Sequence, residues 1–445
     1  MKVLIISYWF PPQNIIGALR VGKLAKYLHA NGHEVRVLAA RTSGNSTLPL
    51  EIPADFVTYT GSSPSRGPLD PIIKLTRKAS VLYKKQGNSP ASTSRLNIHS
   101  GPMSSLRETL TWHYYATFQI PDGFNRWMSG AIAAGDELLR QWRPDLIYAS
   151  APPFSALVVA SKLSEKHGLP WVAELRDLWA ENPYYEFPAW RRCLDRRMER
   201  KTLSASAALV TVTPIWAEVL HRTYSQPVST ILNGYSAEDL PADTRRRSAS
   251  DIVTIAYTGN IYKGYRDPSA LFQAIGQLGP KREKVVVNFY GPTEADVDEL
   301  ARKFGVRDRV FVKPPIPHRE ALAIQRDADV LLLMQWNDKR DEGNIPAKLF
   351  EYLAVLRPIL FLGYEQGTVA QIIRDRGAGL VSNSPERIAR QLAEWIEQRA
   401  SGIPPLPVSA REGLAREEQF RRLEKFIDRE VLANRRHAPC SARPR

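Results

Sequence analysis

Short apolar runs alternate with helical patterns from the first residues of the chain. Val3–Ser7 has the pattern of a buried strand, and Glu34–Ala40 is a second run of this kind. Between them, Gly17–Ala30 carries apolar residues at helical spacing and is followed by Asn31-Gly32, a typical helix stop. This β-α-β unit predicts a parallel, doubly wound sheet of α/β class.

The same alternation continues through the first half of the chain. Residues 42–105 are weakly patterned and rich in Ser, Gly and Pro in places, so we expect a mobile insertion there. After it, the pattern predicts helices at Trp127–Gln141 and Ser155–His167, and strands at Asp145–Ala149, Trp171–Glu174, Leu209–Val212 and Thr230–Leu232.

A second β/α series follows a polar segment, Pro241–Ser250, which we interpret as a linker. Its strands are predicted at Ile252–Tyr257, Val285–Tyr290, Val310–Val312, Val330–Met334, Ile359–Leu362 and Gly379–Val381. We therefore expect an N-terminal Rossmann-like domain over 1–240 and a second one over 241–409. Residues 410–445 should form a charged helix, Ala410–Asn434, and a loose basic tail.

The composition of the chain favours one kind of partner and excludes several kinds of site. The 445 residues include 61 Lys and Arg against 46 Asp and Glu, a net charge of +15 that favours an anionic partner. The chain has two cysteines, which excludes a disulfide framework and a four-cysteine zinc site. No apolar stretch approaches the ~20 residues of a membrane-spanning helix, so we expect a cytoplasmic protein.

A nicotinamide-dependent dehydrogenase does not fit the first β-α-β unit. Its Gly-x-Gly-x-x-Gly fingerprint should follow the first strand, and an acidic residue should end the second. Here the loop offers only Gly17 before the helix, and the second strand ends at Ala40-Arg41. Gly17 could still let a phosphate or sugar approach backbone N–H groups, or could simply begin a helix.

The most informative segment runs from Glu342 to Ala354, after a predicted strand. Lys348 and Glu351 are three residues apart on one helical face. Lys348 in the first helical turn could bind anionic oxygens, and Glu351 could accept hydrogen bonds from a ribose diol, which together suit a nucleoside diphosphate. The alternative is an exposed Lys–Glu pair worth about 0.3–0.5 kcal/mol.

This segment resembles the donor-binding loop of retaining GT-B glycosyltransferases, in particular glycosyltransferase family 4. The family signature is a Glu, seven residues and a second Glu. Glu351 matches the second Glu, whereas Gly343 stands at the first position and Glu342 one residue earlier. The run Pro346-Ala347-Lys348 followed by Glu351-Tyr352-Leu353-Ala354 is similar to a branch with the pattern Pro-x-Lys-x-x-Glu-Tyr-Leu-Ala.

The resemblance extends over almost the whole chain. Tyr8 to Gly17, with Arg20, is similar to the first loop of the family, and Asn233-Gly234 to the end of its first domain. Tyr257 to Gly264 resembles the first loop of its second domain, although Asn260 stands where the family usually has Arg. Lys263 or Arg266 could supply the missing cation. Arg176-Asp177-Leu178-Trp179 is similar to an Arg-Asp-x-Trp of the related branch, although the Arg–Asp pair could merely fix the loop.

The resemblance implies a GT-B fold with two Rossmann-like domains around a central cleft, and a C-terminal helix that returns to the first domain. It implies transfer of a sugar from a nucleotide-diphosphate donor to a glycan or polyprenyl-linked acceptor, with retention and with neither metal nor cofactor. The implied residues are Asp177, Glu342 and Lys348 for catalysis; Gly17, Gly259, Asn260, Lys263, Asn344, Ile345, Lys348 and Glu351 for the donor; and Arg20, Arg176 and Asp177 for the acceptor.

One further segment is strongly basic. Arg191–Lys201 holds six basic residues against Asp195 and Glu199. If helical, it could contact anionic lipid at the cytoplasmic face of a membrane or hold a polyprenyl-diphosphate acceptor; the alternative is an ordinary solvated helix face.

Two other function classes stay open from the sequence. The first is a catalytically silent GT-B subunit that binds a partner or a membrane. The second is nucleic-acid binding through the net positive charge, for which the chain offers no motif.

Overall fold

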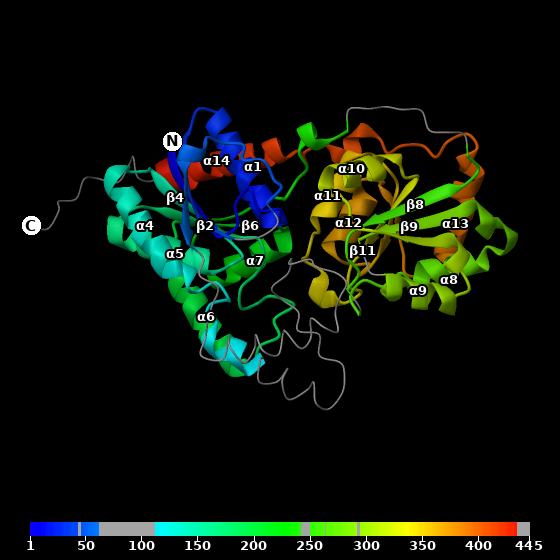
Figure 1. Cartoon of the computed structure of the whole chain (residues 1–445), viewed down its shortest axis with the longest axis horizontal. Helices are drawn as coiled ribbons and strands as arrows, with labels where there is room; N and C mark the ends of the chain where they lie inside the picture. The colour runs from blue at the N-terminus through cyan, green and yellow to red at the C-terminus, as the bar shows by residue number, and fades with distance from the viewer. Residues whose placement is uncertain (43–45, 62–111, 242–249, 263, 292–293, 434–445) are drawn as a thin grey trace, which may run out of the picture. The chain divides into compact units, whose positions relative to one another are not determined.

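A computed structural model describes residues 1–42, 46–61, 112–241, 250–262, 264–291 and 294–433. The chain forms two compact units (Figure 1). Unit 1 contains residues 1–212, 216–231 and 422–445, and unit 2 contains residues 213–215 and 232–421.

Unit 1 is built on a seven-stranded parallel sheet in the order β3-β2-β1-β4-β5-β6-β7. The strands are β1 (Lys2–Ser7), β2 (Glu34–Arg41), β3 (Val57–Gly61), β4 (Leu146–Ala151), β5 (Trp171–Leu175), β6 (Ala208–Thr211) and β7 (Val228–Thr230). The central strands β1, β4 and β5 are buried almost throughout, as expected of a parallel sheet covered on both faces.

Helices α1 (Ile16–Ala30), α4 (Trp127–Gln141), α5 (Ser155–His167), α6 (Ala189–Leu203) and α7 (Pro214–Thr223) connect these strands. Helix α5 ends at Gly168, whose φ of +61° is the left-handed conformation that glycine adopts without strain. Helix α4 packs on α5.

Unit 2 contains a six-stranded parallel sheet in the order β10-β9-β8-β11-β12-β13. Its strands are β8 (Val253–Thr258), β9 (Val285–Tyr290), β10 (Val310–Lys313), β11 (Val330–Met334), β12 (Ile359–Leu362) and β13 (Gly379–Val381). Its helices are α8 (Ser269–Gln277), α9 (Glu294–Lys303), α10 (His318–Asp327), α11 (Ala347–Ala354), α12 (Thr368–Asp375) and α13 (Pro385–Arg399). Leu332 and Leu333 pack into two different apolar clusters, so the sheet is covered on both faces.

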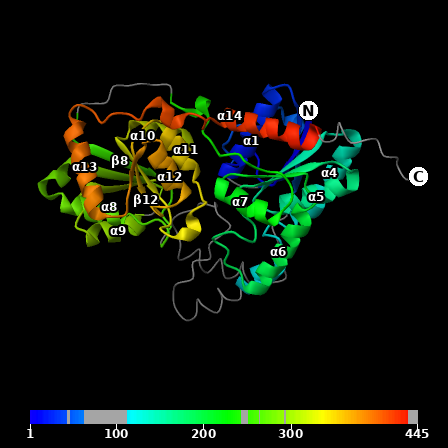
Figure 2. The same ribbon diagram turned by 180° about the vertical axis from the view of Figure 1, so that it is seen from behind.

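Near its end the chain returns to unit 1. Helix α14 (Arg416–Ile427) begins in unit 2, where Arg416 donates hydrogen bonds to the carbonyl oxygens of Asn233 and Gly234. Its second half lies in unit 1 beside α1 (Figure 2). There Glu424 accepts from the Tyr27 hydroxyl. The C-terminal helix therefore returns to the first unit.

Most predicted elements are confirmed, and the differences have local causes. The segment 42–105 was expected to lack regular structure, yet Val57–Gly61 forms the edge strand β3 along β2. The last strand of unit 1 lies at Val228–Thr230, ahead of its predicted place. Helix α14 begins at Arg416, because residues 408–411 form a separate 3-10 turn. The units change at Ile231 and Leu232, since residues 232–236 bind to Arg416 and Gln419.

Candidate functional site

Each sheet reverses its strand order once, and most residues predicted for the donor follow β8 or β11, the strands at the reversal in unit 2. In unit 1 the reversal lies between β1 and β4, and in unit 2 between β8 and β11. Loops at the carboxyl ends of such neighbouring strands form the usual ligand site of open α/β sheets. Gly259 follows β8, and the loop from Gln335 to Pro346 joins β11 to helix α11.

Lys348, in the first turn of α11, reaches across to the loop after β8. Its Nζ lies 4.5 Å from the centre of the Tyr257 ring. A Cβ on Gly259 would fall 2.0 Å from the same Nζ, so a side chain at this position would have to displace the lysine ammonium. Gly259 also has a φ of +133°, which side chains rarely allow.

A second cation, Arg266, stands near Lys348. It donates to the carbonyl oxygen of Asn260 over 2.9 Å and lies above the Tyr262 ring. Burial first, and the Arg266 charge second, lower the pKa of Lys348 to about 7. Asn260 thus helps to fix the arginine through its backbone. The two cations form a positive spot that an anion would stabilise.

Glu351, one turn after Lys348, is held from two sides. His318 Nε2 lies 3.0 Å from one carboxylate oxygen, and Gln325 Nε2 donates to the other over 3.0 Å. Gln325 also donates to the Thr258 hydroxyl over 2.9 Å. Burial acts to raise the pKa of Glu351, but these contacts hold it below its ordinary value. The hydrogen bond to Glu351 raises the pKa of His318.

The rest of the predicted donor loop is ordered by Asp341 rather than by Glu342. The buried Asp341 carboxylate accepts from Gln335 and from Asn344, over 3.2 and 3.1 Å. The side chain of Ile345 is 4% exposed and packs in an apolar cluster, so only its backbone could meet a ligand. Glu342 is half-buried, and its carbonyl oxygen accepts from Thr368 N.

In unit 1, Gly17 and Arg176 lie together. A Cβ on Gly17 would fall 2.4 Å from one terminal nitrogen of Arg176, so the guanidinium lies directly against this first turn of α1. Arg176 is held there by Ser150, whose hydroxyl accepts from Nε over 3.1 Å, and by the carbonyl oxygen of Pro152.

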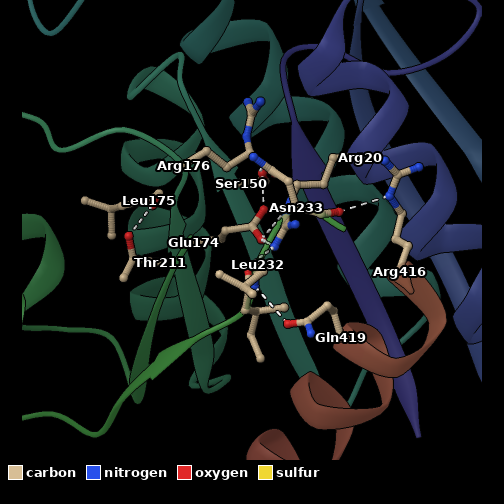
Figure 3. Close-up of polar contacts among 11 residues, drawn as sticks. Arg20, Ser150, Glu174, Leu175, Arg176, Thr211, Leu232, Asn233, Arg416 and Gln419 are labelled. Carbon is tan, nitrogen blue, oxygen red and sulfur yellow. Dashed lines mark hydrogen bonds and ion pairs between the residues drawn. The ribbon is translucent and has the colours of Figure 1, made fainter. Parts of the chain in front are cut away.

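Arg20 was predicted on the acceptor side, and in the structure its guanidinium has partners inside unit 1. It is 3% exposed and forms an ion pair of 2.7 Å with Glu174, which is 1% exposed. Arg20 also donates to the carbonyl oxygen of Ile231 over 3.0 Å, and the Ser150 hydroxyl donates to Glu174 (Figure 3). The guanidinium of Arg20 is therefore used inside unit 1, between α1, β4 and β5.

Asp177 follows Arg176 at the end of β5 and is half-buried. Burial raises its pKa to about 6, although the neighbouring Arg176 acts in the opposite direction. Perturbed carboxylates at the carboxyl end of a strand are candidates for a functional role.

Sequence reasoning missed the residues that hold the predicted ones in place. Glu174 and Ser150 lie inside strands, and His318 and Gln325 lie on α10, far from Glu351 in sequence. A polar residue within a buried strand was the available signal for the first two. Lys263 lies outside the described residues. Within the described ranges, no cluster of three or more His, Cys, Asp or Glu side chains could hold a metal.

The basic segment Arg191–Lys201 is helical, and one of its basic residues is not at its surface. Arg191 is fully buried and donates to Asp195 over 3.0 Å. The charge of Arg191 is therefore used inside unit 1.

Comparison with known proteins finds similar sequences for part of the chain. Residues 17–234 match the model of the glycosyl transferase 4-like domain. A D-inositol 3-phosphate glycosyltransferase from Xylanimonas cellulosilytica is 31% identical over 160 residues, which is 32% of this chain. The matched part spans 38% of that relative's length.

Solved structures with the same architecture match nearly the whole chain. Sucrose-phosphate synthase from Thermosynechococcus elongatus superposes with a TM-score of 0.62 at 14% identity, covering 98% of this chain and 100% of that one. The pneumococcal O-GlcNAc transferase solved with UDP and GlcNAc has a TM-score of 0.57 at 10% identity, covering 97% and 99%. The chain has the GT-B fold of these glycosyltransferases; at such identity the likeness shows the fold alone.

Proposed function

We propose that this chain is a glycosyltransferase that takes its sugar from a nucleoside-diphosphate donor. The observation that carries the proposal is the pair Lys348 and Glu351 on α11, which is a cation for a diphosphate one turn before a carboxylate for a ribose. The glycosyl transferase 4-like match and the GT-B fold support the same reaction class.

Donor binding is proposed for unit 2. Lys348, with Arg266 beside it, stabilises the diphosphate, whose leaving group gains negative charge in the transition state. Glu351 accepts from the ribose hydroxyls, and His318 and Gln325 orient its carboxylate. We propose that the backbone of Gly259, Asn260 and Ile345 also contacts the donor. Lys263 stays a proposed phosphate contact from the sequence.

Acceptor binding is proposed for unit 1. Gly17 and Arg176 form a surface against which a substrate can lie closely, and Asp177 orients an acceptor hydroxyl when it is ionised. We propose a glycan or lipid-linked glycan as the acceptor, used at the cytoplasmic face of a membrane. We also propose that transfer retains the anomeric configuration and requires no metal. Glu342 is kept as a residue near the transferred sugar.

The test is transfer of labelled sugar from a panel of nucleotide sugars to membrane-lipid and glycan acceptors, with a chelator present. Glu351→Gln should weaken donor binding about 10- to 100-fold, because a hydrogen bond to a charged group contributes about 1.5–3 kcal/mol. Glu299→Gln, an exposed change on α9, is the matched control and should behave as wild type.

Two results would contradict the proposal. Wild-type activity in a folded Glu351→Gln variant would remove Glu351 from the donor site. A folded wild type that binds a nucleotide sugar yet never turns it over would favour the silent subunit instead.

A further inference from the structure

Helix α6 turns its negative charges inward. Asp195 is 1% exposed and accepts from Arg191 and from the Tyr185 hydroxyl. Glu199 is 6% exposed and accepts from Ala180 N and from the Tyr224 hydroxyl. Both acidic side chains of the helix are therefore used inside unit 1.

The positive charges of the same helix point outward. Arg197, Arg200 and Lys201 are exposed, as is Arg196, which pairs with Glu181 over 2.7 Å. With Asp195 and Glu199 buried, the outer face of α6 carries basic residues and no acidic ones. The exposed face of α6 is therefore more positive than the composition of the segment indicates, since its two acidic residues are buried and do not offset the exposed charge.

Large apolar side chains are exposed at the start of the same helix. Trp190 is 50% exposed and Leu194 is 40% exposed. Phe118, which is 61% exposed, lies at this end too, because Arg191 donates to the carbonyl oxygens of Ala116 and Gln119 on either side of it. These are three of the seven large apolar side chains exposed in the described part of the chain.

The apolar and basic side chains share one stripe of the helix. Trp190, Leu194, Arg197 and Lys201 follow one another at spacings of four, three and four residues, which places them on one face. We call Phe118, Trp190, Leu194, Arg197, Arg200 and Lys201 the α6 surface.

We propose that the α6 surface docks unit 1 on an anionic phospholipid bilayer. Aromatic and leucine side chains bury themselves at the boundary between headgroups and acyl chains, while lysine and arginine attract anionic headgroups. A nucleic-acid duplex would match the charge but leave Trp190, Leu194 and Phe118 without an apolar partner, because its bases are stacked on one another inside the helix. Within the described ranges no helix is long and apolar enough to cross a bilayer, so the proposed attachment is peripheral.

Vesicle flotation tests this proposal with the full-length chain. Wild type should float with vesicles containing phosphatidylglycerol and stay behind with pure phosphatidylcholine. Salt should weaken the binding, because it screens charges over about 10 Å at 0.1 M.

Two sets of substitutions separate charge from apolar insertion. Replacing Arg197, Arg200 and Lys201 by Gln should lower the partition coefficient about 100-fold, since each cation near an anionic surface contributes about 1 kcal/mol. Trp190→Ser with Leu194→Ser should lower it at least about tenfold, because two side chains lose their apolar burial.

The matched control replaces three exposed basic residues of unit 2, Lys303, Arg387 and Arg390, by Gln and should float as wild type does. Transfer to a soluble acceptor should be unchanged in every variant, which separates docking from catalysis. The proposal would be overturned if wild type did not bind anionic vesicles, or if the control variant lost as much vesicle binding as the α6 variants. Binding of wild type to RNA but not to vesicles would also overturn it.

Discussion

Lys348 is the residue whose environment says most about a ligand. It sits over the Tyr257 ring and against Gly259, with Arg266 nearby, and burial lowers its pKa to about 7. In the free protein this lysine therefore loses its charge near neutral pH. A bound diphosphate would favour the charged form, so donor binding and proton uptake should be coupled.

The first prediction follows from that coupling. The affinity for a nucleotide sugar should fall as pH rises above about 7, by up to tenfold per unit, because the free lysine is then neutral. Lys348→Arg keeps its charge and should bind with little pH dependence. Titration calorimetry from about pH 6 to about pH 9 measures both slopes. An unchanged wild-type affinity over that range would contradict the role given to Lys348.

Asp177 should give the activity a pH dependence of opposite sign, because its carboxylate is needed in the ionised form. Its pKa of about 6 means that the carboxylate becomes available as pH rises through that value. At saturating donor, kcat/KM for the acceptor should therefore increase through pH 6. Asp177→Asn should lower it about 10- to 100-fold, the expected loss of a charged hydrogen bond, and should lack the rise. The same rise in the asparagine variant would assign it to another group.

For single residues, the sequence predicted those site residues that lie close together along one helix. Lys348 and Glu351 share a helical turn, so their common face could be foreseen. His318 and Gln325 could not, because they meet Glu351 only through the packing of α10 on the sheet. The ion pair of Arg20, on helix α1, with Glu174, on strand β5, could not be foreseen either, because the two residues meet only through packing.

Among the elements, the first turn of α1 makes a sharp prediction. Gly17→Ala should displace the Arg176 guanidinium, which lies 2.4 Å from the added carbon, without disturbing a strand. We expect kcat/KM to fall about 10- to 100-fold, as for other small displacements of a positioned group, while the melting temperature changes little.

Gly130→Ala is the matched control for this change. Gly130 lies inside α4 with open space around its added Cβ, so alanine should stabilise the helix by about 0.5–1 kcal/mol and leave activity unchanged. If Gly17→Ala kept normal activity, or if both variants lost kcat/KM equally, the Gly17–Arg176 contact would have no specific role in activity.

The strands differ in how well a local sequence pattern predicts them. Buried parallel strands such as β11 and β12 are continuous apolar runs, and both lie where they were predicted. The edge strand β3, Val-Thr-Tyr-Thr-Gly, lacks such a run and was missed. Its place depends on pairing with β2, which a local pattern does not contain.

For the whole molecule, two α/β units were predictable because each unit repeats the β/α alternation, and the family resemblance implied the GT-B fold. The residues at which the chain passes from one unit to the other were harder to predict. Residues 232–236 join unit 2 because Arg416 and Gln419 bind them, and the end of α14 lies in unit 1 through Tyr27 and Glu424. The net charge of +15 gave a direction, anionic partners, but did not indicate which basic residues would meet them.

The most direct test of the central claim is a thermal-shift screen of wild type against nucleoside diphosphates and their sugar conjugates, with and without magnesium. A ligand at about 100 times its Kd stabilises a protein by ~2.7 kcal/mol, which such a screen detects. The account predicts a selective shift by one nucleotide family, present without metal and lost in Glu351→Gln. A well-folded sample that shows no shift with any of these ligands would contradict a donor site in unit 2.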